Sequence, residues 1–223
     1  MKPFDVITAD QRSYAWYAAR LGCLCASDAA KMCATVKSGE AAARRDLRMR
    51  LVCERLTGRP VEDTYTNADM QRGLELEPQA RIAYEFKAGV SVQQTGFLRH
   101  RDMLAGCSPD GVIGDFDGLV EIKAPRPARH LEYLRGGRVP LDYLPQLTHQ
   151  LWISGAQFVD FVSFDPTMPE RLQLFVARLE RDEAALATYE KKALAFLAEV
   201  DAEVAALLTM ADHESVMRAA VTA

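Results

Sequence analysis

Hydrophobic residues recur with a helical period through the first 90 positions of the chain and with a shorter period after them. In the N-terminal part, apolar residues repeat every three or four positions, and Gly22, Gly58 and Gly89 stand where such runs stop. This pattern predicts a helical region over about residues 10–89. We expect its helices at about 10–20, from residue 27 onward, at about 39–56 and at about 67–87.

Beyond position 89 the pattern is that of a sheet. The stretches VSVQQTGFL, MLAGCSPDGVIG and GLVEIKAP are short, rich in apolar or β-branched residues and separated by turn residues, so they predict three strands. A helical segment follows around YLPQLTHQLWISG, and FVDFVSFDP and LQLFVARL predict two more strands. We therefore expect one α/β domain over residues 1–223, with a central mixed sheet over about 90–180 and a C-terminal helix over about 182–210.

Composition narrows the class of protein. A chain of 223 residues with 49% hydrophobic content is long enough for one sizeable core. The sequence has no apolar segment typical of a signal peptide or a membrane span, and its five cysteines form no CxxC pair, so a cytoplasmic protein with reduced thiols is expected. A net charge of −4 argues against a surface that is basic overall. Arginines nevertheless cluster at 44–59 and 126–138, either as solvated helix faces or as a track for phosphates.

The stretch CSPDGVIGDFDGLVEIKAPRP places charged residues in apolar strands. The two-residue period of a strand puts Glu121 and Lys123 on one face, and a hairpin across GDFDG would bring Asp110 close to Glu121. Buried charges need one another, water or a metal. Carboxylate oxygens suit Mg²⁺, and a lysine near such a cation could orient or deprotonate a water molecule. From these residues alone, an incidental ion pair on an exposed hairpin stays open as the alternative.

A longer resemblance decides between these alternatives. Pro109-Asp110 followed by Glu121-Ile122-Lys123 is the pattern of the PD-(D/E)xK nucleases. Five ordered stretches between about positions 14 and 210 also resemble the phage lambda exonuclease and YqaJ-like viral recombinase family, namely WYAARLGCLCASDAAKM, GLELEPQARIAYEFKAGVSVQ, CSPDG, GLVEIKAP and YLPQLTHQLW with the later FDPTM. The resemblance implies a restriction-endonuclease-like core, a twisted mixed sheet flanked by helices.

The resemblance also implies roles for individual residues at a catalytic site. It implies a site with two Mg²⁺ ions, for which Mn²⁺ can substitute, a water-activating Lys123 and a glutamine, Gln146, beside the metals. Glu75 is the alternative to Glu77 as the helix carboxylate, and Pro78 is expected to kink or restart the helix that carries them. The implied metal ligands are Asp110, Glu121, Glu77 and the backbone carbonyl of Ile122.

A second set of residues resembles the family's pocket for a 5′-terminal phosphate. It consists of Arg20, Ser27 and Ser108, which offer a guanidinium group and two hydroxyls. For Ser27 an ordinary helix N-cap is the alternative. The histidines His130 and His149 and the tryptophans Trp16 and Trp152 are expected to be structural.

The function implied is that of a Mg²⁺-dependent 5′→3′ exonuclease. It would digest the 5′-phosphorylated strand at double-stranded DNA ends to mononucleotides and leave 3′ single-stranded overhangs. A homotrimeric ring would enclose the DNA, and a single-strand annealing protein of the Bet or RecT type would receive the product. Two other hypotheses stay open: a structure-specific or restriction-type endonuclease on the same core, and a non-catalytic DNA-binding module for recombination.

Overall fold

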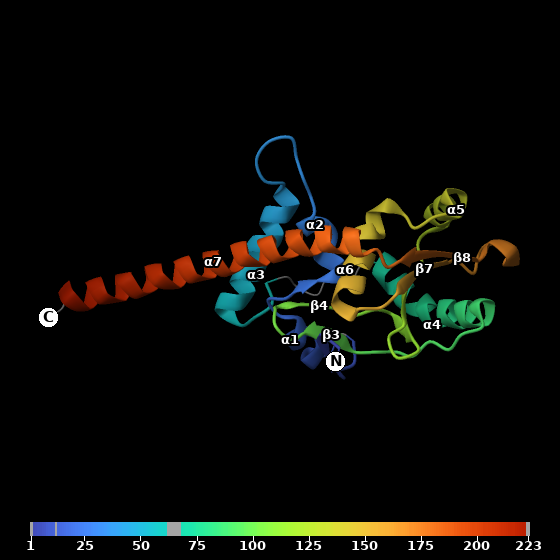
Figure 1. Ribbon diagram of the computed structural model, residues 1–223, viewed down its shortest axis with the longest axis horizontal. Coiled ribbons are helices and arrows are strands. Elements are labelled where there is room, and N and C mark those ends of the chain that lie inside the picture. Colours follow the sequence, from blue (N-terminus) through green and yellow to red (C-terminus); the bar gives the residue numbers. More distant parts are fainter. Residues whose placement is uncertain (1, 12, 62–67, 222–223) are drawn as a thin grey trace.

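The computed structural model describes residues 2–11, 13–61 and 68–221, and side chains as far as residue 210 (Figure 1). The chain forms two four-stranded sheets with helices between and around them, in the orders β1-β3-β4-β2 and β5-β6-β7-β8. The strands are β1 (Phe4–Ile7), β2 (Leu24–Cys25), β3 (Phe97–His100), β4 (Ala105–Cys107), β5 (Gly111–Ile113), β6 (Gly118–Lys123), β7 (Phe158–Phe164) and β8 (Leu174–Glu180). The helices are α1 (Tyr14–Arg20), α2 (Ala29–Met32), α3 (Ala42–Thr57), α4 (Ala68–Ala88), α5 (Pro127–Gly136), α6 (Leu144–Ser154) and α7 (Glu183–Val221), with short 3₁₀ turns η1 (Ala26–Asp28), η2 (Leu141–Tyr143) and η3 (Glu170–Leu172).

The α/β class is confirmed, but the single central sheet is wrong. The predicted strand MLAGCSPDGVIG is divided at Ser108-Pro109-Asp110 into β4, which pairs with β2 and β3, and β5, which pairs with β6. Pro109 has no N–H to donate to a ladder, and strands therefore tend to end at such a residue. The break between the two sheets consequently coincides with the predicted site.

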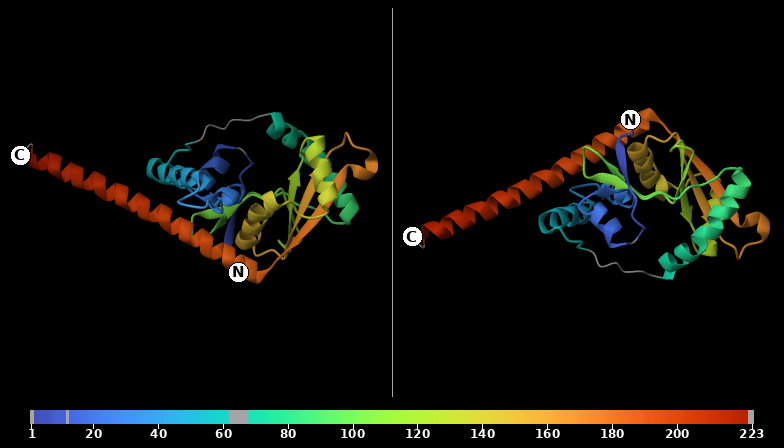
Figure 2. Two further views of the ribbon diagram at one scale, coloured as in Figure 1. Left: turned by 90° about the horizontal axis from the view of Figure 1, so that it is seen from above. Right: turned by 90° about the horizontal axis from the view of Figure 1, so that it is seen from below.

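Helix α6 lies between the two sheets and contributes to the core on both sides. Ile153 packs in the cluster that contains α3, α7 and the first sheet, while Leu147 and Leu151 pack against Phe161 of the second sheet. The opposite face of the second sheet is covered by α4, whose Tyr84 packs among side chains of β6 and β7. Figure 2 shows this layering from above and below.

The predicted helices exist with shifted boundaries. Gly58, with φ 65°, ends α3 in the left-handed region, and its N–H bonds to the carbonyl of Glu54. Helix α4 runs through Pro78 without a restart. The sequence pattern missed β1, β2 and α5, and it ended α7 early. That helix continues to Val221, and its last part extends away from the rest of the molecule (Figures 1 and 2).

In the part of the chain that the structure describes, no helix is long and apolar enough to span a membrane.

Candidate active site

The hairpin of β5 and β6 brings Asp110 next to the Glu-Ile-Lys segment, as predicted. Gly111 lies opposite Val120, and the N–H of Asp110 donates to the carbonyl of Val120 at 3.1 Å. The N–H of Ile122 in turn donates to Oδ2 of Asp110 at 2.7 Å. Because the N–H and C=O of one strand residue point toward the same side, the carbonyl of Ile122 faces the edge on which Asp110 lies.

Glu121 is buried, with only 2% of its surface exposed, and both its carboxylate oxygens accept hydrogen bonds. Oε1 accepts from Lys123 Nζ and, at 2.6 Å, from Nε2 of Gln146 on α6. Oε2 accepts from Nε2 of Gln150 at 2.6 Å. The prediction that Glu121 and Lys123 share a strand face is confirmed. Gln150 was missed, although its position one helical turn after Gln146 was a usable signal.

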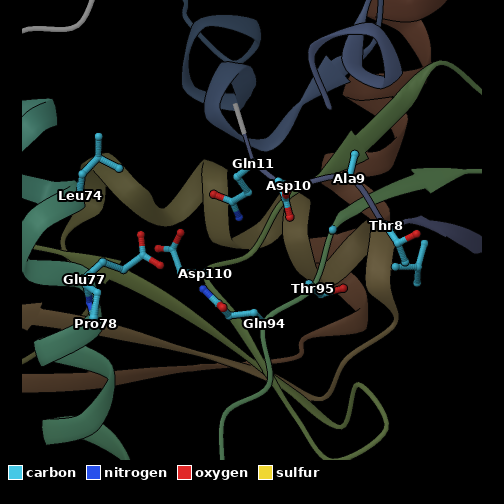
Figure 3. Close-up of a pocket in the computed structure, with 12 residues that line it drawn as sticks. Thr8, Ala9, Asp10, Gln11, Leu74, Glu77, Pro78, Gln94, Thr95 and Asp110 are labelled. Carbon is cyan, nitrogen blue, oxygen red and sulfur yellow. The ribbon is translucent and has the colours of Figure 1, made fainter. Parts of the chain in front are cut away.

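Glu77 reaches the same region from α4. Its Oε1 accepts from Arg81 at 2.5 Å, and it lines a pocket of about 540 Å³ together with Asp110. Figure 3 shows the two carboxylates pointing toward each other, with the segment from Thr8 to Gln11 on another wall of the pocket. Glu75, in contrast, is exposed and accepts from Gln71, so it is the solvated helix charge.

The carboxylates leave the site rich in negative charge. Burial and the negative charges of Glu121 and Glu77 raise the pKa of Asp110 well above its usual range, although Lys123 opposes the shift. For Lys123, burial lowers the pKa, but the carboxylates of Glu121 and Asp110 outweigh burial and raise it. The expected lowering of the Lys123 pKa is therefore not produced by the protein groups alone, and it would need added positive charge.

The donor set fits a hard divalent cation, although it is not arranged as a closed cage. Among the described residues, no three His, Cys, Asp or Glu side chains form a ready metal site. Glu121 is turned to its glutamine and lysine donors and Glu77 to Arg81, which accounts for this. Mg²⁺ usually keeps several waters and takes only one or two carboxylates. Asp110, Glu77, Glu121 and the Ile122 carbonyl could therefore hold it.

Arg20 and Ser108, two of the residues predicted to bind a phosphate, lie together at the end of α1. Arg20 donates to Oγ of Ser108 at 3.4 Å, and the indole N–H of Trp16 donates to the same oxygen at 3.1 Å. The guanidinium of Arg20 lies over the Trp16 ring, 3.9 Å from its centroid. Trp16 packs against the core cluster of Cys23, Cys25 and Phe97, as predicted, and its N–H also supports the contact between Arg20 and Ser108. Its position one turn before Arg20 on the same helix was a usable signal.

Ser27 is exposed in η1 and caps no helix, since Asp28 occupies the N-cap position of α2. Cys25 of β2 pairs with Gly106 of β4 in a parallel register, so the start of η1 follows beside the segment that leads to Ser108. The interpretation of Ser27 as an ordinary N-cap is therefore wrong. Its role at a phosphate stays a prediction.

Most arginines of α3 are engaged within the chain. Arg45 pairs with its neighbour Asp46. The other four form ion pairs with acidic residues, mainly of α7, and these contacts attach α7 along α3. The pairs are Arg44 with Glu40 and Glu199, Arg48 with Glu40 and Glu203, Arg50 with Asp28, and Arg55 with Asp201.

The two histidines that were predicted to be structural are buried and hydrogen-bonded. His130 contacts Ser163 and the carbonyl of Leu172, while His149 contacts Tyr189 and the carbonyl of Gly106. Both bridge elements of the core.

Comparison with known proteins agrees with this fold. A family model for the YqaJ-like viral recombinase domain matches residues 15–157. The alkaline exonuclease LHK-Exo from Laribacter hongkongensis is 40% identical, with 90% of this chain and 99% of that chain covered; its structure matches with a TM-score of 0.81, and its complex with dAMP matches with 0.82. A phage-related exonuclease from Haemophilus somnus, 14% identical, shares the fold over 83% of this chain and 96% of its own with a TM-score of 0.62. Among curated proteins, none matches the chain significantly.

The fold and these likenesses define the class of protein: the chain is a nuclease with a PD-(D/E)xK fold. It belongs to the YqaJ-like viral recombinase family, as the sequence motifs predicted.

Proposed function

We propose that the protein is a Mg²⁺-dependent 5′→3′ exonuclease that digests the 5′-phosphorylated strand of linear duplex DNA to mononucleotides and leaves 3′ overhangs. One observation carries the proposal. The carboxylates of Asp110 just before β5, Glu121 of β6 and Glu77 of α4 lie near Lys123 at the end of the β5–β6 hairpin, beside an open pocket. The likeness to an alkaline exonuclease over nearly the whole of that chain supports the same chemistry.

Each residue has a distinct task in this proposal. Asp110, Glu77, Glu121 and the carbonyl of Ile122 would hold Mg²⁺, for which Mn²⁺ can substitute, with two ions in the site. The bound cations supply Lewis-acid stabilisation of the charge on the phosphate oxygens. Lys123 would orient the attacking water. It could accept a proton from that water only when its own amine is neutral, and positive charge nearby favours the neutral amine. Gln146 holds Glu121 in place from α6.

The proposal assigns recognition of the strand end to Arg20, Ser108 and Ser27. Because Oγ of Ser108 already accepts from Arg20 and Trp16, its own hydrogen stays available for donation to a phosphate oxygen. The guanidinium of Arg20 adds a charge-assisted donor. The pocket of about 540 Å³ beside the carboxylates has the volume of a small-molecule site. LHK-Exo has been crystallised with dAMP, a deoxynucleoside monophosphate of the kind such a digestion releases.

The proposal extends to assembly and partners. A homotrimeric ring in the host cytoplasm would enclose double-stranded DNA and pass the product strand to a single-strand annealing protein. Because the α3 arginines are engaged by acidic residues, the channel charge would come mainly from the 126–138 segment. There, Arg135 and Arg138 are exposed and pair with no acidic group among the described residues. Membership of a viral recombinase family supports a role in recombination.

Digestion of defined substrates tests the proposal. We would incubate the protein with linear duplexes carrying 5′-phosphate or 5′-hydroxyl ends and with a closed circle, each with Mg²⁺, with Mn²⁺ or with EDTA. We expect mononucleotides from the 5′-phosphorylated linear duplex with either metal, and none from the circle or in EDTA. Cleavage of the circle would indicate an endonuclease instead. DNA binding without cleavage of any substrate would indicate the non-catalytic module.

A further inference from the structure

Gln150 occupies a position where packing alone does not explain a polar residue. Its side chain is fully buried on α6, between Leu147 and Leu151 of the same helix, which both pack in the core. Its Oε1 has no hydrogen-bond partner among the described residues. A buried polar atom without a partner is unfavourable, so an apolar residue would suit this position better if only packing mattered.

The contact that Gln150 does make is directed at the active site. Its Nε2 donates to Oε2 of Glu121 at 2.6 Å. The amide cannot be reversed, because its carbonyl oxygen would then face a carboxylate oxygen and two acceptors would repel each other. The carboxylate of Glu121 therefore fixes the orientation of Gln150, and the donor fixes the carboxylate in return.

Two glutamines one helical turn apart donate to different oxygens of the Glu121 carboxylate. Gln146 is half-buried and donates to Oε1, the oxygen that also accepts from Lys123. Gln150 is deeper and holds Oε2. The terminal torsion of a glutamate has no sharp preference of its own, so its plane is set by such contacts. Gln150 thereby holds Oε2 of Glu121, and Oε1 stays on the side of Lys123.

We propose that Gln150 is a positioning residue that fixes the orientation of the Glu121 carboxylate for binding of the divalent cation. The inference rests on the proposed metal-dependent nuclease activity. Groups that hold a metal ligand in place typically change metal affinity when they are removed, by about 10-fold to 100-fold.

The test measures metal binding and stability in the absence of DNA as well as cleavage. Gln150→Met removes the donor at nearly constant volume, and Gln150→Leu is the second variant if the first does not fold. Thr148→Ala on the same helix is the matched control, because its hydroxyl donates only to the carbonyl of Leu144. Mn²⁺ affinity is measured by calorimetry, unfolding temperature without metal by circular dichroism, and cleavage across a range of Mg²⁺ concentrations.

We expect both Gln150 variants to melt below the wild-type temperature, because the buried Oε2 of Glu121 loses its donor. We also expect them to bind Mn²⁺ about 10-fold to 100-fold more weakly and to need correspondingly more Mg²⁺ for half-maximal cleavage. The control should match the wild type in all three measurements. Unchanged Mn²⁺ affinity in the variants would overturn the inference, whether or not their stability falls. If the wild type binds no Mn²⁺ and cleaves without added metal, the proposed function fails. If the wild type is active and metal-dependent but the Gln150 variants match it, only the role of Gln150 fails.

Discussion

Asp110 and Ile122 are joined by a hydrogen bond in which the backbone N–H of Ile122 donates to Oδ2 of Asp110 at 2.7 Å. The aspartate side chain thus continues the β5–β6 ladder by one step beyond its last backbone contact. The same side chain lies opposite Glu77 in the pocket (Figure 3). The Asp110 carboxylate therefore has two roles. Its Oδ2 accepts a structural hydrogen bond, and the whole group supplies negative charge that the proposed chemistry requires.

Asp110→Asn separates these two tasks. The amide oxygen of asparagine can still accept from Ile122, while the negative charge is lost. Because the pKa of Asp110 is raised in the folded state, its ionised form disfavours folding as the pH rises above the unfolded value, and the variant should be as stable as the wild type or more stable at neutral pH. We expect cleavage to fall by several orders of magnitude, measured as mononucleotide release. Cleavage close to that of the wild type would contradict the assignment of Asp110.

Lys123→Met should reduce both activity and stability. It removes the group proposed to orient the water, and it leaves the buried Glu121 without its cationic partner. We expect cleavage to fall by several orders of magnitude and the denaturation midpoint to fall as well. Lys31→Met is a suitable control, because Lys31 is about half exposed and its pairing with Asp28, at 3.9 Å, is at the edge of contact. Near-normal turnover of the Lys123 variant at neutral pH would rule out its role with the water.

The parts of the site that could be predicted from the sequence are those that depend on neighbouring residues. The hairpin joins Asp110 and Glu121 through a short turn, and the two-residue period alone places Glu121 and Lys123 on one face. The contact between Gln150 and Glu121 crosses 29 positions and depends on how α6 packs between two sheets. No local pattern specifies that packing.

The same reason explains the arginines of α3. Their charge and spacing are visible in the sequence, but their partners on α7 lie about 150 positions away, such as Glu199 for Arg44 at a separation of 155. A local pattern could therefore not decide between a phosphate track and a solvated face. The structure shows a third use, the attachment of one helix to another.

Arg20→Ala should reduce the preference for 5′-phosphorylated ends. A charge-assisted hydrogen bond contributes about 1.5–3 kcal/mol, which corresponds to a loss of roughly 10-fold to more than 100-fold on phosphorylated ends and little change on hydroxyl ends. The measurement is the ratio of digestion rates on the two substrates. Arg20→Lys keeps the charge but loses the fork geometry, so an intermediate ratio is expected. A wild-type ratio in the alanine variant would show that Arg20 has only a structural role.

Trp16→Phe tests the group beneath Arg20. It keeps an aromatic face for the guanidinium but removes the N–H that donates to Ser108. We expect the preference for phosphorylated ends to fall less than in Arg20→Ala, because the charge is retained and only the orientation of the hydroxyl is loosened. The same pair of substrates gives the measurement. A loss equal to that of Arg20→Ala would mean that the indole N–H matters as much as the guanidinium.

Assembly into a ring predicts a measurable mass and a measurable kinetic behaviour. One chain of 24.8 kDa with a net charge of −4 has few groups with which to hold a polyanion as salt rises. A closed trimer would hold the DNA by enclosure. We expect a solution mass near three chains by light scattering, and continued digestion of a started duplex after competitor DNA is added. A monomer that stops when the competitor is added would contradict the ring and leave the proposed chemistry intact.

His149 predicts a specific dependence of stability on pH. The ring is fully buried, and its Nε2 lies 3.1 Å from the carbonyl of Gly106, which can only accept, so Nδ1 accepts from the hydroxyl of Tyr189. Burial lowers the pKa of His149 to about 3, although the contact with Gly106 opposes the shift. The unfolded chain takes up a proton at this residue below about pH 6.5 and the folded chain does not, so the stability present above that pH is lost as the pH falls toward 3. The loss of folding free energy accumulates at up to about 1.4 kcal/mol per pH unit.

His149→Gln, which can donate and accept but does not titrate, should therefore lose about 2 kcal/mol less stability than the wild type between pH 7.5 and 5 in urea unfolding. The wild type and the variant share the same carboxylates, so the pH dependence due to these carboxylates cancels in the difference. Identical losses of stability in the two proteins would show that His149 takes up a proton in the folded state.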